Sequence, residues 1–361
     1  SYGVYRPIRP GDLLPEYVDR LLRVEGYKAE YMCRSTGINS SRLRLYPDDF
    51  LRIPIVCPPI SEQAAMVRYL DHVDRRVRRL VRAKRKLIAL LTEQKQAIIH
   101  RAVTRGLDPD VPLKDSGVEW LGEVPAHWEV RKLKSLTRFI NGLAFKPSDW
   151  ERQGTPIIRI QNLNGADDFN YTTRTDLPSS LLIKPGDLLF AWSGNRGTSF
   201  GSFIWDRKFA AYLNQHIFKL EGYHLNRNYF AYVLRAVTRH VEEEKTHGII
   251  GLVHVTKPEL GRVLVPVAPD EEQGAIAEYL EQTTADIGIA ITRTNREIDL
   301  LIEYRTRLTA DVVTGKLDVR EAAAELPEVD PLAADDEPDI LDAGSEPDLD
   351  EVDAIPEEVE V

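Results

Sequence analysis

One block of the sequence occurs twice, and this duplication limits what the chain can fold into more than any other feature. Residues 61–108 align without a gap on residues 271–318, at a constant shift of 210. Identical pairs recur along the whole block: Gln63 and Gln273, Tyr69 and Tyr279, Leu91 and Leu301, Asp108 and Asp318. A short apolar segment precedes each copy, RIPIVCPP and RVLVPVAP. The repeat predicts two related structural units separated by about two hundred residues.

Each copy is expected to form a long amphipathic helix, because apolar residues recur at steps of three and four and neither copy contains Pro. Pro58 and Pro59 followed by Ser61 match a helix start. About 40 helical residues would extend on the order of 60 Å. A single helix cannot bury its own apolar stripe, so we expect the two to pair as an antiparallel coiled coil.

The alternative is two unrelated helices, each lying on its own domain, but neither neighbouring domain is large enough to cover such a stripe. In the coiled coil, the residues expected at the helix seam are Val73, Val77, Leu80, Leu87, Leu91, Ile98, Ile287, Ile291, Ile298, Leu301 and Leu308.

The first helix carries a strongly basic run, RRVRRLVRAKRK, at residues 75–86. Such a run is usually a solvated face of a helix. A site for phosphate groups or for an acidic partner subunit is the alternative.

Between the helices, residues 126–269 contain short β-rich runs broken by Gly, Pro, Asn and Asp. One helical segment begins at Asn226 and precedes a closing strand. This pattern predicts a mixed α+β domain.

Two loops of this domain carry side chains that suit DNA. The run SGNRGTSFGS, residues 193–202, places Asn, Arg, Ser and Thr donors on a Gly-rich backbone that can approach a base edge or a phosphate closely. IIRIQNLNG, residues 157–165, supplies Arg, Gln and Asn at a strand end, types that can make bidentate contacts to guanine or adenine. Taken singly, a loop of either kind is more often an ordinary turn. The candidate DNA-binding residues are Asn141, Lys146, Arg159, Gln161, Asn162, Ser193, Asn195, Arg196, Thr198, Lys245 and His247.

The net charge of −10 hides an uneven distribution along the chain. Of the 57 acidic residues, 17 lie in residues 321–361, which contain no Lys or Arg. Residues 1–320 therefore contain 40 acidic and 47 basic residues, a net charge of +7. The acidic end is rich in Pro and lacks aromatic residues, so we expect a disordered tail. The tail could simply solvate the protein, or it could compete with DNA for the basic surface.

Several classes of function find no support in the sequence. There is no phosphate-binding GxxxxGK[ST] loop, no methyltransferase motif, no zinc-like grouping of Cys and His, and no apolar stretch of membrane-spanning length. We therefore expect a cytoplasmic, non-catalytic protein without a metal or cofactor of its own.

Taken together, these segments resemble the specificity subunits of type I restriction-modification systems. The residues that carry the resemblance are the connector DSGVEWLGEVPAHWEVRKL, the strand and loop GDLLFAWSGN, the strand NQHIFKL, and the duplicated Glu-Gln helix start. It covers roughly residues 14–318. The expected segments are 1–60, the closing part of a first target-recognition domain; 61–106, a central long helix; 107–125, a connector; 126–269, a second target-recognition domain; 270–316, a distal long helix; and 321–361, the acidic tail.

The resemblance implies a subunit that binds double-stranded DNA and reads a bipartite target, one half with each recognition domain. It further implies that the long helices bind modification (methyltransferase) subunits, through which restriction (endonuclease/translocase) subunits join. S-adenosylmethionine, ATP and Mg²⁺ would be bound by those partners. Residues 1–57 match only the end of a first recognition domain, so we expect an N-terminally incomplete subunit. The alternatives are a half-length specificity protein acting as a homodimer, and a coiled-coil scaffold or regulator that does not read DNA.

Overall fold

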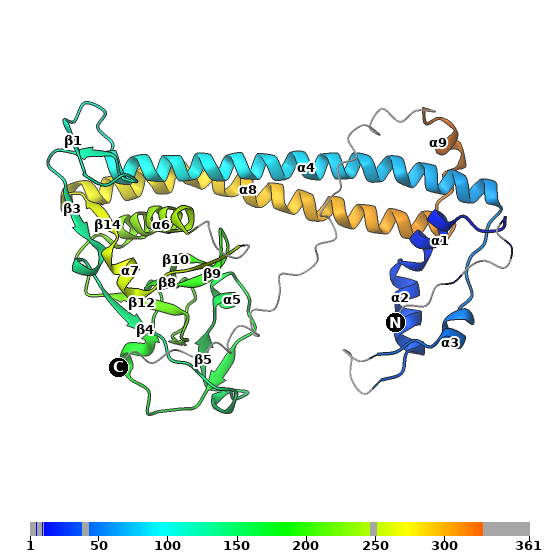
Figure 1. Cartoon of the computed structure of the whole chain (residues 1–361), viewed down its shortest axis with the longest axis horizontal. Helices are drawn as coiled ribbons and strands as arrows, with labels where there is room; N and C mark the ends of the chain where they lie inside the picture. The colour runs from blue at the N-terminus through cyan, green and yellow to red at the C-terminus, as the bar shows by residue number, and fades with distance from the viewer. Residues whose placement is uncertain (1–4, 6–8, 10, 38–42, 246–250, 328–361) are drawn as a thin grey trace. The chain divides into compact units, whose positions relative to one another are not determined.

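The structure, a computed structural model, divides into two compact units (Figure 1). Unit 1 combines residues 1–89 with 292–361, and unit 2 comprises residues 90–291. Two long helices, α4 (Ile60–Arg105) and α8 (Asp270–Val313), each contribute one end to each unit. The structure describes residues 5, 9, 11–37, 43–245 and 251–327. These helices and the sheets of unit 2 confirm the expected α+β fold with two long helices.

Unit 1 is helical in its described part. Its shorter helices are α1 (Pro15–Leu22), α2 (Glu25–Arg34), α3 (Pro47–Leu51) and α9 (Arg320–Ala324). The core joins Tyr17 and Leu21 of α1 to Leu70 of α4 and to Leu308 and Val312 of α8. Segments from the two ends of the chain therefore build one core.

Unit 2 contains the sheets. Its strands are β1 (Leu113–Asp115), β2 (Glu123–Pro125), β3 (Glu129–Lys132), β4 (Arg138–Asn141), β5 (Thr155–Ile158), β6 (Asn170–Thr172), β7 (Leu182–Ile183), β8 (Leu188–Ala191), β9 (Ser193–Asn195), β10 (Gly201–Ile204), β11 (Ala211–Leu213), β12 (Ile217–Glu221), β13 (Leu252–His254) and β14 (Leu264–Val267). Its shorter helices are α5 (Ile160–Leu163), α6 (Arg227–Glu244) and α7 (Lys257–Arg262).

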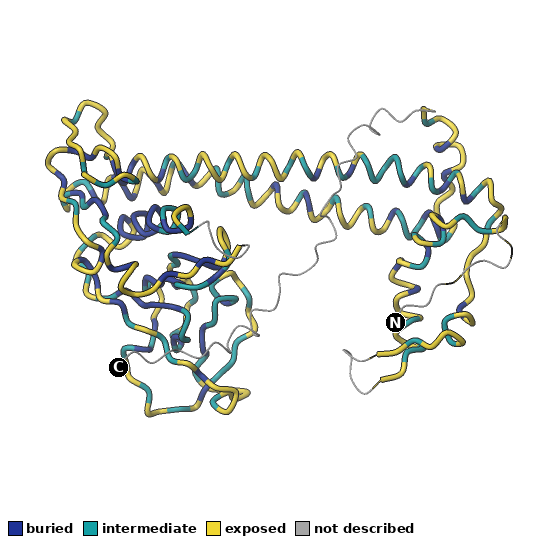
Figure 2. Tube along the Cα trace, in the orientation of Figure 1, coloured by how far each residue is buried: buried dark blue, intermediate teal, exposed yellow. Residues whose placement is uncertain are grey.

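Two four-stranded sheets form the centre of unit 2. One has the order β10-β8-β12-β4 and is antiparallel throughout, with Phe190 opposite Phe218. The other has the order β6-β5-β11-β7, in which β5 and β11 run parallel. Helix α6 contributes Tyr229, Phe230 and Leu234 to the main core, and Figure 2 shows this helix as largely buried.

The glutamine of the duplicated Glu-Gln pair has the same role in both copies. Gln63 is fully buried; its amide donates to the carbonyls of Asp12 and Pro58, and its oxygen accepts the Leu14 N–H at 2.8 Å. Gln273, 1% exposed, donates to the Ala268 carbonyl and accepts the Asn226 N–H at 2.7 Å. Each glutamine thus joins the start of a long helix to the start of the shorter helix packed against it, α1 or α6.

A buried tyrosine repeats with the glutamine. Tyr17 in α1 and Tyr229 in α6 are both fully buried. The Tyr17 hydroxyl lies 3.0 Å from the carbonyl oxygens of Val56 and Val313, and the Tyr229 hydroxyl lies 3.3 Å from that of Pro266. Burial raises the pKa of Tyr17 to about 12 and also raises that of Tyr229. Both phenols therefore stay neutral and act as structural hydrogen-bonding groups.

Within each unit the ends of α4 and α8 pack side by side in opposite directions, with a seam spaced by three and four residues. In unit 1, Val77 and Val81 pack with Ile298. In unit 2, Ile99 belongs to the same cluster as Ile276 and Leu280. The predicted seam residues Val77, Ile298 and Leu308 are buried, and those half-buried are Val73, Leu91, Ile98, Ile287, Ile291 and Leu301.

The structure corrects the seam at two positions. Leu80 and Leu87 are 48% and 46% exposed, and the seam passes instead through Val81, which is fully buried, and half-buried Ile88. Between these two it passes the charged Lys84, whose Nζ lies 2.5 Å from a carboxylate oxygen of Glu297. A search for apolar residues alone misses a register that includes a paired lysine.

The start of the predicted disordered tail is also corrected. Residues 320–324 form α9, and Val319 and Ala323 beside and within it are buried. The remainder of the tail, from residue 328, lies outside the described residues. Among the helices that are described, none is long and apolar enough to cross a bilayer.

Candidate nucleic-acid interface

The loop between β9 and β10 is held in place from within. Gly194 in β9 lies so close to Ser199 that a Cβ there would stand 2.6 Å from the Ser199 carbonyl group. The Asn195 N–H donates to Ser199 Oγ at 2.6 Å, and the Asn195 carbonyl accepts the N–H groups of Ser199 and Phe200. These contacts fix the conformation of the loop.

Two neighbouring elements secure the tip of this loop. Strand β13 pairs with β9, which places His254 opposite Ser193, and the Arg196 N–H donates to the Gly251 carbonyl at 2.8 Å. From α6, a carboxylate oxygen of Glu242 accepts the Gly197 N–H at 2.7 Å. Gly197 has a φ of +75°, a conformation that glycine adopts without strain.

The electrostatics of the tip depend on Glu242, which is 7% exposed. Burial raises its pKa, while the Gly197 N–H and the positive charge of Arg196 act in the opposite direction. Arg196 and Thr198 are exposed. The loop thus presents a cation and a hydroxyl on a backbone held by a buried carboxyl group.

An aromatic group at the base of the loop was not predicted from the sequence. The Trp192 ring lies 5.0 Å from the rings of both His216 and His254, in edge-to-face geometry, and its indole N–H donates to the Gln215 carbonyl. Burial is the main cause of a lowered pKa at His254. The alternation in Leu252-Val253-His254, with the valine buried, is the only sequence signal that could have indicated an outward-facing histidine.

The segment after β5 behaves differently from the prediction. Asn162 is 2% exposed; its oxygen accepts the Arg159 N–H, and its amide donates to the carbonyls of Ala166 and Asp168. These bonds use the whole amide group inside the turn, so Asn162 is a structural residue and not a base-contacting one. Arg159 is half-buried with its guanidinium 5.8 Å from the centre of the Trp150 ring, and Gln161 is half-buried.

The remaining predicted residues are dispersed. Asn141 ends β4 and Lys146 begins a short 3₁₀ turn, and both are exposed. Lys245 lies 2.7 Å from Glu259, and this contact is the main reason that the pKa of Glu259 falls to about 2. His247 lies outside the described residues. Ser193, Asn195, Arg196 and Thr198 are thus together on one hairpin, while Arg159, Gln161 and Asn162 belong to a separate turn and helix.

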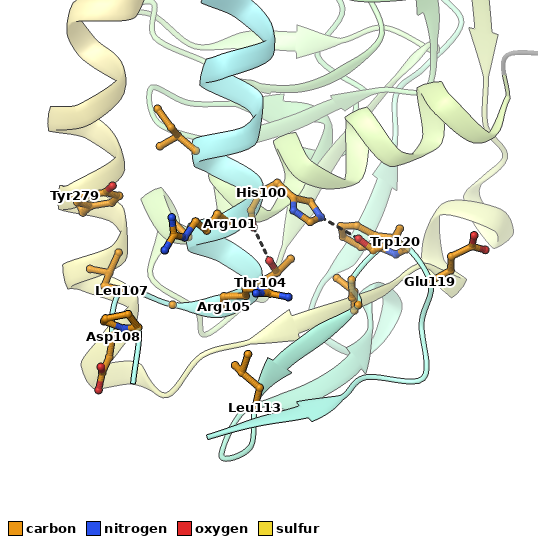
Figure 3. A pocket seen from close by; sticks show the side chains of 16 residues that line it. His100, Arg101, Thr104, Arg105, Leu107, Asp108, Leu113, Glu119, Trp120 and Tyr279 are labelled. Atoms are coloured by element: carbon orange, nitrogen blue, oxygen red, sulfur yellow. Dashed lines mark hydrogen bonds between the residues drawn. The ribbon is translucent and has the colours of Figure 1, made fainter. Parts of the chain in front are cut away.

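A second site in unit 2 is an open cavity of about 930 Å³ where α4 ends and the connector folds back (Figure 3). A ring nitrogen of His100 lies 2.9 Å from the Trp120 carbonyl oxygen. Arg101, Arg105 and Tyr279 line the cavity, and Arg105 is 3.2 Å from Glu123. A cavity of this size admits a few side chains but not a nucleic-acid duplex.

Comparison with known proteins finds a matching domain family for the central part of the chain. Residues 125–299, which contain the loop and both four-stranded sheets, match the family model described as type I restriction modification DNA specificity domain. This part of the chain is therefore similar to the DNA specificity domain of type I restriction-modification systems. No group of three or more His, Cys, Asp or Glu residues among those described could hold a metal ion.

Relatives of known identity agree with this assignment. The MjaVIII specificity subunit of Methanocaldococcus jannaschii is 26% identical over 302 residues, which is 80% of this chain and 66% of the relative. The EcoBI specificity subunit of Escherichia coli is 25% identical over 209 residues, 57% of this chain and 42% of the relative. The chain therefore spans less than two thirds of either relative's length.

A solved structure supports the fold. A chain from a study of complex assembly and conformational transition in the type I R-M system superposes with a TM-score of 0.56 at 17% identity, over 84% of this chain and 72% of that one. Both relatives are specificity subunits, in agreement with the family resemblance that the sequence predicted.

Proposed function

We propose that this chain binds double-stranded DNA and that unit 2 reads one half of a bipartite target. The observation that carries the proposal is the β9–β10 loop inside the matched DNA specificity domain: exposed Arg196 and Thr198 flank Gly197, whose N–H is bound by buried Glu242. Arginine suits the acceptor pair of guanine, and a fixed backbone lowers the entropy lost on binding. The described part of unit 1 has no sheet, so we assign reading only to unit 2.

The loop assignment is tested with Arg196→Ala in the full chain, assembled with its modification subunits. If Arg196 contacts a base, affinity for the target duplex falls by about 1–3 kcal/mol and the preference at one base pair relaxes. Arg131→Ala is the matched control, because Arg131 is an exposed arginine of β3 in the same unit. If the substitution lowered the affinity equally for all duplexes, Arg196 would be a phosphate contact. If the affinity did not change, the proposal that this loop reads DNA would be rejected.

Glu242 is proposed as a positioning residue for the same loop. Glu242→Ala removes the acceptor of the Gly197 N–H, whereas Glu242→Gln retains an acceptor oxygen. We expect the alanine variant to lose target preference and the glutamine variant to recover most of it. A loss that glutamine does not rescue would show that the carboxylate charge, and not the loop position, is what matters.

For the complex, we propose that the long helices and the connector bind modification subunits, and that restriction subunits join through these. We further propose that S-adenosylmethionine, ATP and Mg²⁺ are bound by these partner subunits and that the complex works in the cytoplasm. The cavity beside Arg101 offers a cation and aromatic rings to an acidic side chain of such a partner. Arg101→Glu should reduce co-purification of the modification subunit, and Arg131→Glu should not.

The target itself is best found by mapping methylated adenines in DNA from cells that carry the chain and its partners. A methylated bipartite sequence that disappears with the chain supports the proposal. Methylation that does not depend on the chain, together with no salt-dependent duplex binding by the assembled complex, would refute it.

A further inference from the structure

The chain leaves the described structure at a defined place on α4. After α9, Arg68 of α4 donates to the carbonyl oxygens of Leu326, at 2.5 Å, and Pro327, at 3.2 Å. Arg320 at the start of α9 lies 3.3 Å from Glu62, also on α4. The last described residues are therefore fixed against the first turns of α4, within unit 1.

The basic run of α4 begins close to this exit. Arg75 follows Arg68 by seven residues, which is about 10 Å along a helix. Residues 75–86 contain eight Arg or Lys residues. Val77 and Val81 occupy the buried side of this stretch, whereas Arg76, Arg85 and Lys86 are exposed. We call the exposed side of residues 75–86 the basic face.

The segment that continues from the exit has the opposite charge. Residues 328–361 contain 15 Asp or Glu residues and no Lys or Arg. Fully extended, 34 residues span roughly 110 Å, several times the distance to the far end of the basic face. Because one end of the segment is already fixed at Arg68, its effective concentration near the basic face is in the millimolar range, about that expected for a short flexible link.

We propose that residues 328–361 dock on the basic face of α4. The docked segment neutralises the basic face and shields it from other polyanions. This interaction is independent of the reading function of unit 2, since it uses only residues of unit 1. Surface charges interact over about 10 Å at 0.1 M salt, so the contact weakens as ionic strength rises.

The test is zero-length carbodiimide cross-linking of the dilute full chain, followed by peptide mass mapping. Amide bonds should form between Lys86 and carboxylates of residues 328–361 several-fold more often than between that segment and Lys132 or Lys134, which are exposed lysines of unit 2. Raising the salt concentration should reduce the Lys86 products. A mixture of ¹⁴N- and ¹⁵N-labelled chains should show that they form within one chain.

Variants separate docking from simple proximity. Arg76→Gln with Arg85→Gln leaves Lys86 in place but removes two charges of the basic face, and we expect the yield of Lys86 cross-links to fall several-fold. Arg131→Gln with Arg138→Gln, two exposed arginines of unit 2, is the matched control and should leave the yield unchanged. Cross-links spread evenly over exposed lysines, formed only between chains, or insensitive to the first pair of substitutions would overturn the proposal. In that case the basic face would be available to bind DNA phosphates or an acidic partner.

Discussion

In each copy of the repeat, a buried glutamine and a buried tyrosine form hydrogen bonds with backbone groups where a long helix begins, and we call each such pair a bracket. Both copies keep the bracket, but the contacts around it differ. Gln63 with Tyr17 and Gln273 with Tyr229 are buried and bond backbone groups at the same junction. Beside the first bracket, Arg20 pairs with Asp71 and Asp74 at 2.5 and 2.7 Å.

The residue of α6 that corresponds to Arg20 is Tyr232, and the Arg235 guanidinium lies 5.0 Å from the centre of its ring. Arg20 therefore links α1 to α4, whereas the contact of Tyr232 with Arg235 lies within α6. The hydrogen bonds of the glutamine and the tyrosine are therefore common to both copies, whereas the contacts beside them are not.

The largest predicted effect concerns the helix seam. Val81→Asp places a carboxylate at a fully buried position in unit 1 and should destabilise that unit by about 3 kcal/mol or more. The repeat-equivalent Ile291 is only half-buried, so Ile291→Asp should cost less in unit 2. Leu80→Asp is the adjacent control and should change stability by about 0.5 kcal/mol or less. Urea unfolding combined with amide hydrogen exchange measures the free energy of unfolding of each unit. If Leu80→Asp and Val81→Asp lowered it equally, the assignment of Val81 to the seam would be contradicted.

Removing the brackets should have the next largest effect. Gln63→Ala and Gln273→Ala each leave buried backbone groups without partners, so each should lose about 1–3 kcal/mol of unfolding free energy in its own unit. Gln282→Ala, at an exposed position of α8, serves as the control. If hydrogen exchange showed one glutamine to be dispensable, the two brackets would not be equivalent.

A glycine inside α8 distinguishes the copies on a smaller scale. Gly288 corresponds to Arg78 in the repeat, and a Cβ at residue 288 would stand 3.7 Å from Lys95 Nζ, an ordinary contact. Gly288→Ala should therefore stabilise unit 2 by about 0.5–1 kcal/mol through helix propensity. Burial already lowers the pKa of Lys95, and a loss of stability on thermal unfolding would mean that the lysine cannot tolerate further crowding.

The smallest predicted effect depends on pH and affects unit 2. His240 of α6 stacks on Trp120 of the connector with ring centres 4.8 Å apart, and burial lowers its pKa despite nearby Glu243 and Glu244. The unfolded chain therefore takes up a proton first as the pH falls below about 6.5, and the stabilisation is progressively lost. His240→Phe keeps the ring contact and should flatten this part of the stability curve. An identical pH dependence in both proteins would reject the assignment.

The sequence predicted the long helices and their antiparallel pairing because a repeat and a three-to-four spacing are local and strong. It did not predict that the seam passes through Val81. This seam also includes the charged Lys84, and only the structure shows that Lys84 pairs with Glu297 of the other helix. The candidate loop was found from its composition, but the role of Glu242 and the rings around Trp192 was not. Those contacts join residues far apart in the chain. The burial of Asn162 was missed because its partners are backbone N–H and carbonyl groups of its own turn.

The Tyr17 hydroxyl bonds the carbonyl oxygen of Val313, 296 residues further along the chain. At synthesis rates of about 5–20 residues per second, the ribosome needs roughly 15–60 s to travel that distance. During this time the whole of unit 2, whose residues 90–291 are continuous, has emerged and can fold. Unit 1 can therefore be completed only after unit 2 has been synthesised, and the apolar side chains of α1 wait during that time for their partners in α8.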